Sequence, residues 1–192
     1  NGSLARWLYT AAGEDRRVLF FNLAIEDIQG AADLLKPVYD GTHGRDGFVS
    51  LEVSPDLAYD VEGTIAEAER LHDRVNRANL MIKVPATQEG VLAFENLVMK
   101  GINVNVTLLF SVERYKEVVE AYLVGLETRV RQGLAISGIA SVASFFVSRV
   151  DTAVDTLLKV HSTTNPDAAQ LQGCIAIANA KLSYAWYQQI FN

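Results

Sequence analysis

Short apolar segments alternate along the chain with longer segments that have the periodicity of amphipathic helices. The short segments are rich in β-branched residues and stop at proline, glycine or polar turns, which is typical of β-strands. The predicted strands are residues 48–53, 80–84, 102–109 and 139–147. Because these strands are largely apolar and a helical segment follows each one, the pattern indicates an α/β protein with a parallel sheet covered by helices.

The segments around the strands are predicted to be helices. They comprise the first 40 residues and residues 64–75, 90–100, 112 to about 131, 150–160 and 168–191. Ser111 is expected to cap the fourth of these helices, and Gly101 to close the third. Residues 174–177 could instead form a short strand, and the pattern leaves this open. No linker rich in Gly, Pro or Ser divides the sequence, so residues 1–192 are predicted to form a single domain.

Polar side chains occupy one face of each predicted strand. Since strand side chains alternate between faces, Glu52, Lys83, Thr107 and Ser144 each lie opposite apolar neighbours. They are separated by 31, 24 and 37 residues, which matches successive βα units of roughly 30 residues. Equivalent faces of neighbouring parallel strands would bring these groups together. In a (βα) barrel that shared face is the interior, and the active site lies at the carboxyl ends of the strands.

Lys83 carries the strongest chemical signal in the sequence. A lysine is rarely buried without a partner, and this one is centred in an apolar strand. Desolvation would lower its pKa and yield the neutral amine that attacks a carbonyl to form a Schiff base. Two structural interpretations stay open: the side chain could extend to solvent at a sheet edge, or it could form an ion pair with Glu52.

The other polar residues have alternatives of the same kind. Glu52 could transfer protons, or only balance the charge of Lys83. The polar face of the third strand, Asn103, Asn105 and Thr107, could bind a ligand, or its members could bond to one another. Arg149 follows the fourth strand, where a helix begins, and could bind a phosphate group there. It could also form an ion pair with an acidic residue of the same helix, Asp151 or Asp155.

Charge and composition exclude several classes of partner. The 192 residues carry a formal net charge of −6, which argues against nucleic acid or an anionic membrane as partner. No apolar run of about 18 residues is present to span a membrane. The single cysteine, Cys174, is expected to be buried and cannot form an internal disulfide, so the cytoplasm is the expected location. The three histidines lie far apart, and no metal site is predicted.

Four segments of the sequence resemble a known family. They are residues 46–55 (DGFVSLEVSP), 79–87 (NLMIKVPAT), 101–111 (GINVNVTLLFS) and 141–151 (SVASFFVSRVD). In this order they resemble transaldolase, and residues 23–29 (LAIEDIQ) and 177–182 (IANAKL) are similar to the bacterial members. The resemblance extends over essentially the whole chain. It implies a Schiff-base aldolase fold, the (βα)₈ or TIM barrel, and a place in the pentose phosphate pathway.

The resemblance also implies a reaction and the residues that perform it. The reaction moves a dihydroxyacetone unit from sedoheptulose 7-phosphate to glyceraldehyde 3-phosphate, without cofactor or metal. Its products are erythrose 4-phosphate and fructose 6-phosphate. Lys83 matches the Schiff-base lysine of the family, and Glu52 matches the acid/base carboxylate. Thr107 matches a residue that helps hold the water through which this carboxylate works.

Four further residues match the substrate-binding groups of the family. Asn105 and Ser144 match residues that contact the dihydroxyacetone unit. Phe146 matches a residue that lines the pocket, and Arg149 matches an arginine that binds phosphate. The implied partners are therefore sugar phosphates.

The resemblance implies that this chain corresponds to the central part of a longer barrel. In the family, the first two strands carry a catalytic aspartate and an Asn-containing motif, and neither motif occurs in this sequence. The last two strands, with a second phosphate-binding basic residue, have no counterpart either. The chain is thus expected to provide strands three to six, with flanking helices, of a partial (βα)₈ barrel.

Two alternatives to a transaldolase stay open. A fructose 6-phosphate aldolase would release free dihydroxyacetone; those relatives are usually shorter barrels that use a tyrosine for proton transfer, so Glu52 and the long helices argue against this. A non-catalytic half-barrel would persist as a folding or assembly unit. Four parallel strands without closure leave two open edges, and self-association through these edges is expected.

Overall fold

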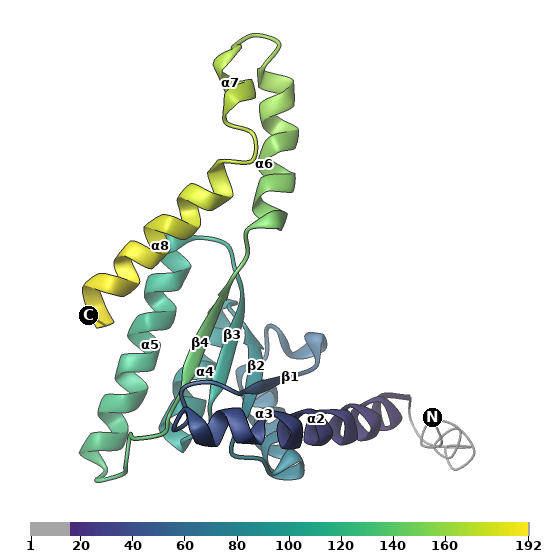
Figure 1. The fold of residues 1–192 in the computed structure, drawn as a ribbon, viewed down its shortest axis with the longest axis vertical. Helices are drawn as coiled ribbons and strands as arrows, with labels where there is room; N and C mark the ends of the chain where they lie inside the picture. The colour runs from purple at the N-terminus through teal and green to yellow at the C-terminus, as the bar shows by residue number, and fades with distance from the viewer. Residues whose placement is uncertain (1–15, 192) are drawn as a thin grey trace.

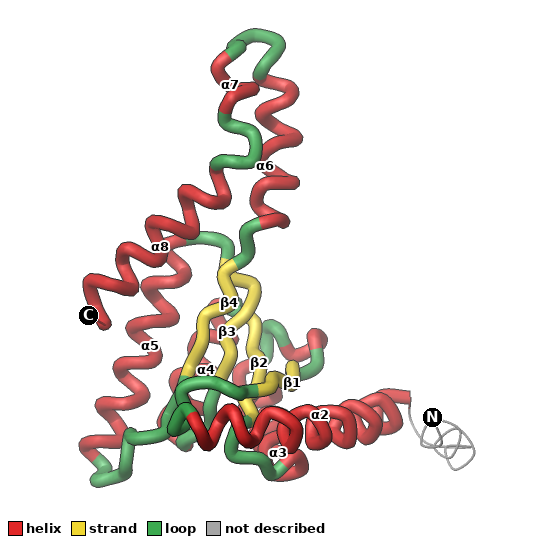
Figure 2. Tube along the Cα trace, viewed as in Figure 1, coloured by secondary structure: helices red, strands yellow, loops and turns green. Residues whose placement is uncertain are grey.

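The computed structural model describes residues 16–191 and contains one four-stranded parallel sheet. The strands lie side by side in the order of the sequence, with helices around them (Figures 1 and 2). They are β1 (Val49–Glu52), β2 (Leu80–Pro85), β3 (Val104–Leu109) and β4 (Ser141–Phe145). The predicted α/β class and the parallel sheet are therefore confirmed.

Helices precede and follow each strand. They are α2 (Arg16–Gly41), α3 (Val61–Val75), α4 (Gln88–Lys100), α5 (Val112–Arg131), α6 (Ser148–His161), α7 (Asp167–Gln170) and α8 (Ile175–Phe191), and a short 3₁₀ turn, η1 (Pro55–Leu57), follows β1. All predicted helices are present except that the last one is divided. The part of the first predicted helix that falls on residues 1–15 lies outside the described residues.

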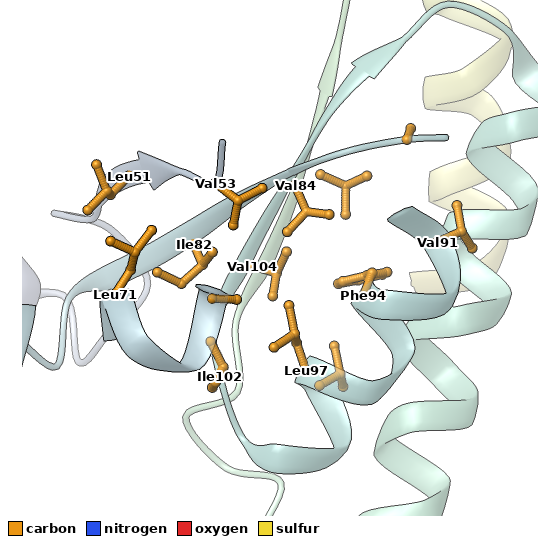
Figure 3. Close-up of a cluster of buried hydrophobic side chains, with 14 of the residues drawn as sticks. Leu51, Val53, Leu71, Ile82, Val84, Val91, Phe94, Leu97, Ile102 and Val104 are labelled. Carbon is orange, nitrogen blue, oxygen red and sulfur yellow. The ribbon is translucent and has the colours of Figure 1, made fainter. Parts of the chain in front are cut away.

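The sheet buries one face against helices α3, α4 and α5. Leu51, Ile82, Val84 and Val104 point into a cluster with helix residues such as Phe94 (Figure 3). Each of these strand positions is at most 7% exposed, and burial of such side chains supplies the main stabilisation of the domain. The alternate positions of the same strands carry the polar side chains, as the sequence pattern predicts.

The helices begin and end where side chains can satisfy their terminal backbone groups. Thr87 caps α4 by accepting a hydrogen bond from the amide of Gly90, and Ser111 caps α5 in the same way through the amide of Arg114. Gly101 ends α4 with a φ of 86°, a left-handed conformation that glycine adopts without strain. The roles predicted for Ser111 and Gly101 are confirmed.

Polar contacts attach α2 to the rest of the domain. Arg77 donates hydrogen bonds to both carboxylate oxygens of Asp33, at 2.6 and 3.0 Å, and this bonding lowers the pKa of the Asp33 carboxyl. The buried amide of Asn79 donates to the carbonyl oxygens of Ala32 and Gly47, both at 2.9 Å. These bonds fix the C-terminal half of α2 against the segments that lead into β1 and β2.

The C-terminal helices differ from the sequence prediction. Helices α6 and α7 extend away from the sheet beyond the end of β4, and α8 returns to lie beside α5 (Figure 1). The single helix predicted over 168–191 is wrong, because a turn over residues 171–174 separates α7 from α8. In this turn the Asp155 carboxylate accepts a hydrogen bond from the amide of Gly173. Residues 175–177 belong to α8 and not to a strand, and Cys174, expected to be buried, is exposed.

Within residues 16–191, no helix combines the length and the apolar character that crossing a membrane requires.

Candidate active site

Lys83 and Glu52 form an ion pair near the carboxyl ends of two neighbouring strands. The two residues are register partners of β1 and β2, so their side chains leave the sheet on the same face. Lys83 Nζ lies 3.2 Å from Glu52 Oε2. The Lys83 side chain is 30% exposed and that of Glu52 is 46% exposed. The ion pair, one of the two structural alternatives that the sequence left open, is therefore present, and Lys83 is partly accessible rather than fully buried.

The backbone around this pair is tied down on both sides. The amide of Val53 donates to the carbonyl of Lys83 at 3.1 Å, which extends the β1–β2 ladder past Glu52. The amide of the next residue, Ser54, donates to a carboxylate oxygen of Glu67 in α3 at 2.6 Å. A hydrogen bond to a charged acceptor is stronger than a neutral one. The segment that carries Glu52 is thus held against both β2 and α3.

Asn105 lies beside Lys83 on the next strand. The two residues are register partners of β2 and β3. The Asn105 side chain bonds to a serine on each side: its Nδ2 donates to Ser50 Oγ at 3.1 Å, and its Oδ1 accepts from Ser144 Oγ at 2.7 Å. The structure therefore brings together Glu52, Lys83, Asn105 and Ser144 on one face of the sheet, as the strand spacing predicts.

Thr107 lies two residues beyond Asn105, at an irregular part of β3. Its side chain is buried, and among the described residues its Oγ1 has no hydrogen-bond partner. The next residue, Leu108, has a φ of 61°, and the β3–β4 register shifts between Val106 and Leu109. A leucine in the left-handed region is strained, and such strain is typical of functional sites. A buried hydroxyl without a protein partner is suited to bonding a ligand or a water.

The polar positions of β3 do not bond to one another, in contrast to one interpretation of the sequence. Within the described part of the chain, Asn103 Oδ1 accepts a hydrogen bond from the amide of Ala140, at 2.9 Å. Asn103 therefore fixes the loop that leads into β4. Asn105 and Thr107 lie within β3, where they are the register partners of Lys83 and Pro85, whereas Asn103 precedes the strand.

Phe146 and Arg149 form a second group beyond the end of β4. The Arg149 guanidinium lies 4.6 Å from the centre of the Phe146 ring, a cation–π contact that orients the side chain. The acidic residues offered as alternative partners bond elsewhere, because Asp151 and Asp155 accept hydrogen bonds from the amides of Ala176 and Gly173. Within residues 16–191, Glu52 forms its ion pair with Lys83 and none with Arg149.

The N-terminus of α6 lies next to this arginine. Arg149 is the second residue of the helix, and no side chain caps the helix at Val147. The first amides of a helix carry a partial positive charge and favour anions. The arginine and the helix terminus together can attract a phosphate group.

Sequence reasoning did not identify Ser50 as part of the site. The available signal was its position, two residues before Glu52 and on the same strand face. Serine is a common strand-face residue, however, and the identity of its partner depends on the three-dimensional register.

A cavity of about 710 Å³ lies elsewhere in the molecule, between α5, β4 and α8. Its walls are mainly aromatic and small side chains, and none of the seven residues predicted for the site lines it. Burial raises the pKa of the Tyr115 hydroxyl in this cavity, with a further contribution from Tyr187. The polar cluster on the sheet face, not this cavity, therefore has the composition of a catalytic site.

Among the described residues, no group of three His, Cys, Asp or Glu side chains is arranged to hold a metal ion.

Comparison with known proteins relates the chain to one family. The sequence model described as Transaldolase/Fructose-6-phosphate aldolase matches residues 5–192. "Transaldolase 1" of Streptomyces avermitilis is 54% identical over 165 residues, which cover 86% of this chain and 43% of that protein. "Transaldolase" of Thermobifida fusca is 54% identical over 166 residues, 86% of this chain and 45% of the relative. "Transaldolase 2" of a Nostoc species is 44% identical over 186 residues, 93% and 49% of the two chains. The chain thus spans less than half the length of these relatives.

Proposed function

The chain belongs to the transaldolase/fructose-6-phosphate aldolase family, and we propose that it carries the Schiff-base centre of a transaldolase. The observation that carries this proposal is the Lys83–Glu52 pair near the carboxyl ends of adjacent parallel strands, with Lys83 Nζ 3.2 Å from Glu52 Oε2. An amine and a carboxylate in contact are the two groups that imine formation needs, a nucleophile and a proton carrier. The relatives named transaldolase support the same assignment.

The chemistry follows from these two groups. The Lys83 amine adds to the ketone of a sugar phosphate, and loss of water gives a protonated imine. When the donor C–C bond breaks, its hydroxyl gives its proton to a water molecule, an aldose phosphate departs, and the electron pair enters the imine to form an enamine. The enamine then attacks the acceptor aldehyde, whose oxygen takes up a proton from water, and hydrolysis of the new imine frees Lys83. Glu52 moves protons in the steps that gain and lose water.

Substrate binding is assigned to the groups around this pair. Asn105 and Ser144 bond to the hydroxyls of the dihydroxyacetone unit, because their polar atoms flank Lys83 on the next two strands. Phe146 lines the substrate pocket at this end of the sheet. Arg149 binds the phosphate together with the first amides of α6.

Thr107 is assigned to the water through which Glu52 works. Its buried Oγ1 has no hydrogen-bond partner in the described part of the protein, and an unbonded buried hydroxyl costs about 1–3 kcal/mol. A bridging water relieves this cost and links Thr107 to the carboxylate. The strained Leu108 that follows fixes the direction of this strand end.

The four-stranded sheet corresponds, on this proposal, to strands three to six of a (βα)₈ barrel. The strands are parallel, adjacent in sequence order and covered by helices on one face, and the opposite face with Lys83 is the barrel interior. Residues 1–192 then form part of one domain. Sugar phosphates are the substrates, and the cytoplasm is the location.

A donor-discharge experiment tests the function. The chain is incubated with fructose 6-phosphate, freed from excess donor by rapid desalting, and treated with borohydride either at once or after a delay. We expect intact-mass analysis to show a reduced three-carbon unit that persists during the delay in buffer and disappears when erythrose 4-phosphate is added first. The persistence is expected because the enamine of a transaldolase is discharged by an aldehyde and not by a proton.

Two other outcomes would replace the proposal. If the adduct is lost in buffer as fast as in the presence of erythrose 4-phosphate, and free dihydroxyacetone is released, the protein is a fructose 6-phosphate aldolase. A folded chain that acquires no adduct at all, beside a labelled relative of full length, would identify a non-catalytic unit.

A further inference from the structure

Ser50 is a polar residue of the sheet face to which the proposed reaction gives no role. It is the second residue of β1 and lies two positions before Glu52, on the same face. Its partner is on a strand that is not adjacent to β1: Asn105 Nδ2 of β3 donates to Ser50 Oγ at 3.1 Å. The bond therefore passes over β2, the strand that carries Lys83.

This bond holds one end of an amide whose other end is held by Ser144. Ser144 Oγ donates to Asn105 Oδ1 at 2.7 Å. The terminal torsion of an asparagine is soft by itself and samples a broad range. Two hydrogen bonds to opposite ends of the amide, from β1 and from β4, restrict this rotation. The plane of the Asn105 amide is thereby fixed beside its register partner, Lys83.

The hydrogen-bonding capacity of the amide shows what this orientation achieves. An asparagine side chain offers two N–H donors and two acceptor lone pairs. The two serines use one donor and one lone pair of Asn105. One donor and one lone pair remain, and their directions are set by the same amide plane.

We propose that Ser50 is a positioning residue that orients the Asn105 amide toward the three-carbon unit bound at Lys83. Ser50 does not touch the substrate on this assignment and acts through Asn105 alone. The inference rests on the proposed function, because it concerns the group that Lys83 binds. Without the Ser50 hydroxyl, the amide rotates more freely and meets the hydroxyls of the donor less often in the productive orientation.

Borohydride trapping with fructose 6-phosphate, measured as rate against donor concentration, tests this role in the 192-residue chain. At low donor concentration, the slope of trapping rate against donor concentration is expected to be about tenfold lower in Ser50→Ala. This is the effect of one lost hydrogen bond of ordinary strength. Ser50→Thr, which keeps the hydroxyl, is expected to restore most of it. Ser141→Ala is the matched control. Its hydroxyl bonds to the carbonyl of Val104 in the same sheet, and trapping is expected to be unchanged.

A double-mutant cycle separates positioning from a merely structural effect. In an Asn105→Ala background, Ser50→Ala should have no further effect on trapping, because its only route to the substrate is gone. The side-chain amide signals of Asn105 in a ¹H–¹⁵N spectrum should shift in Ser50→Ala and not in Ser141→Ala. These signals report on the Ser50–Asn105 contact without any turnover.

Each outcome decides the question. The role of Ser50 alone would be overturned if Ser50→Ala lowered trapping equally in the wild-type and the Asn105→Ala backgrounds. It would also be overturned if Ser50→Ala left trapping unchanged while the wild type is labelled. A wild-type chain that acquires no label would overturn the proposed function, and the role of Ser50 with it.

Discussion

At the scale of single residues, the Lys83–Glu52 pair contributes little to stability. Both side chains are substantially exposed, and ion pairs in such positions contribute about 0–1 kcal/mol. The charge-balancing interpretation and the catalytic interpretation of Glu52 therefore make different predictions. Removing the Glu52 charge should affect folding little on either interpretation. It should slow imine formation strongly only if Glu52 carries protons.

Glu52→Gln tests this difference. We expect the rate of borohydride-trapped imine formation to fall by about 10²-fold or more, since general acid–base catalysis contributes 10²–10⁴. The free energy of unfolding, measured with urea, should change by less than about 1 kcal/mol. Glu69→Gln is the matched control because Glu69 pairs with Lys100 at the surface. An unchanged trapping rate in Glu52→Gln would leave Glu52 with charge balance only.

Thr107→Val tests the buried hydroxyl. Valine has nearly the same shape, and the hydroxyl it replaces has no hydrogen-bond partner in the described structure, so the protein should be as stable as the wild type or more stable. Imine trapping should fall about tenfold, since one water-mediated bond is lost. Thr64→Val is the control, because Thr64 Oγ1 is bonded to the carbonyl of Leu57. That variant should lose stability and keep its trapping rate, and a reversed pattern would contradict the role of Thr107.

The sequence predicted part of this site and not the rest, for reasons that differ among residues. The pairing of Lys83 with Glu52 was predictable, because alternation and spacing assign both to one face of adjacent strands. The bond between Asn105 and Ser50 was not, because it joins two strands that are not neighbours and depends on side-chain rotation. The left-handed Leu108 was unpredictable as well, since leucine rarely adopts that conformation.

At the scale of elements, the junction between β2 and α4 positions Lys83. The strand ends at Pro85, and α4 begins at Gln88. A Cβ atom at Gly90 would lie 1.9 Å from the carbonyl oxygen of Pro85, so the helix approaches the strand end as closely as its backbone allows. This close approach explains why a glycine stands in the first turn of the helix.

Gly90→Ala should therefore destabilise the domain. The clash is with a backbone atom and forces the junction apart, at a cost of about 1–3 kcal/mol in the free energy of unfolding. Gly30→Ala is the matched control: Gly30 lies in α2 with no atom within 4 Å of the added Cβ, and alanine should stabilise that helix by about 0.5–1 kcal/mol. Urea unfolding of both variants gives the comparison, and equal stability of Gly90→Ala and wild type would show that the junction can relax.

Strands and helices were predicted in the right order, and some ends, such as those of α5, agree with the prediction, but others do not. Pairing with neighbours shortened three predicted strands; the fourth, for example, runs over Ser141–Phe145 and not 139–147. The turn between α7 and α8 escaped prediction although it contains a glycine, Gly173, whose φ is 69°. In this turn the amide of Gly173 donates to the carboxylate of Asp155, which lies 18 residues earlier in the chain.

At the scale of the whole molecule, the sheet has two open edges. The strand order places β1 and β4 at the edges, and unpaired edges are prone to pair with other chains. The β4 edge is the more exposed of the two, since none of its five residues is buried and Val142 is 45% exposed, whereas Leu51 of β1 is buried. The 192-residue chain is therefore expected to self-associate through β4.

Light scattering after size exclusion measures this association. The measured mass of the wild type should rise with protein concentration. The mass of Val142→Lys should be lower at each concentration, because a charged side chain on an edge strand disfavours pairing. Leu157→Lys is the matched control on α6, where Leu157 is 61% exposed and distant from the edge. A monomer at all concentrations, or dissociation by Leu157→Lys in place of Val142→Lys, would contradict edge pairing.

The central claim is that Lys83 is the residue that forms the Schiff base, and mapping the trapped adduct tests it most directly. The chain is treated with fructose 6-phosphate and borohydride, digested, and analysed by mass spectrometry, with Lys83→Met in parallel. Of the six lysines in the sequence, we expect Lys83 alone to carry the reduced three-carbon unit, and Lys83→Met to carry none. Labelling spread over several lysines, or equal labelling of Lys83→Met and wild type, would contradict the account.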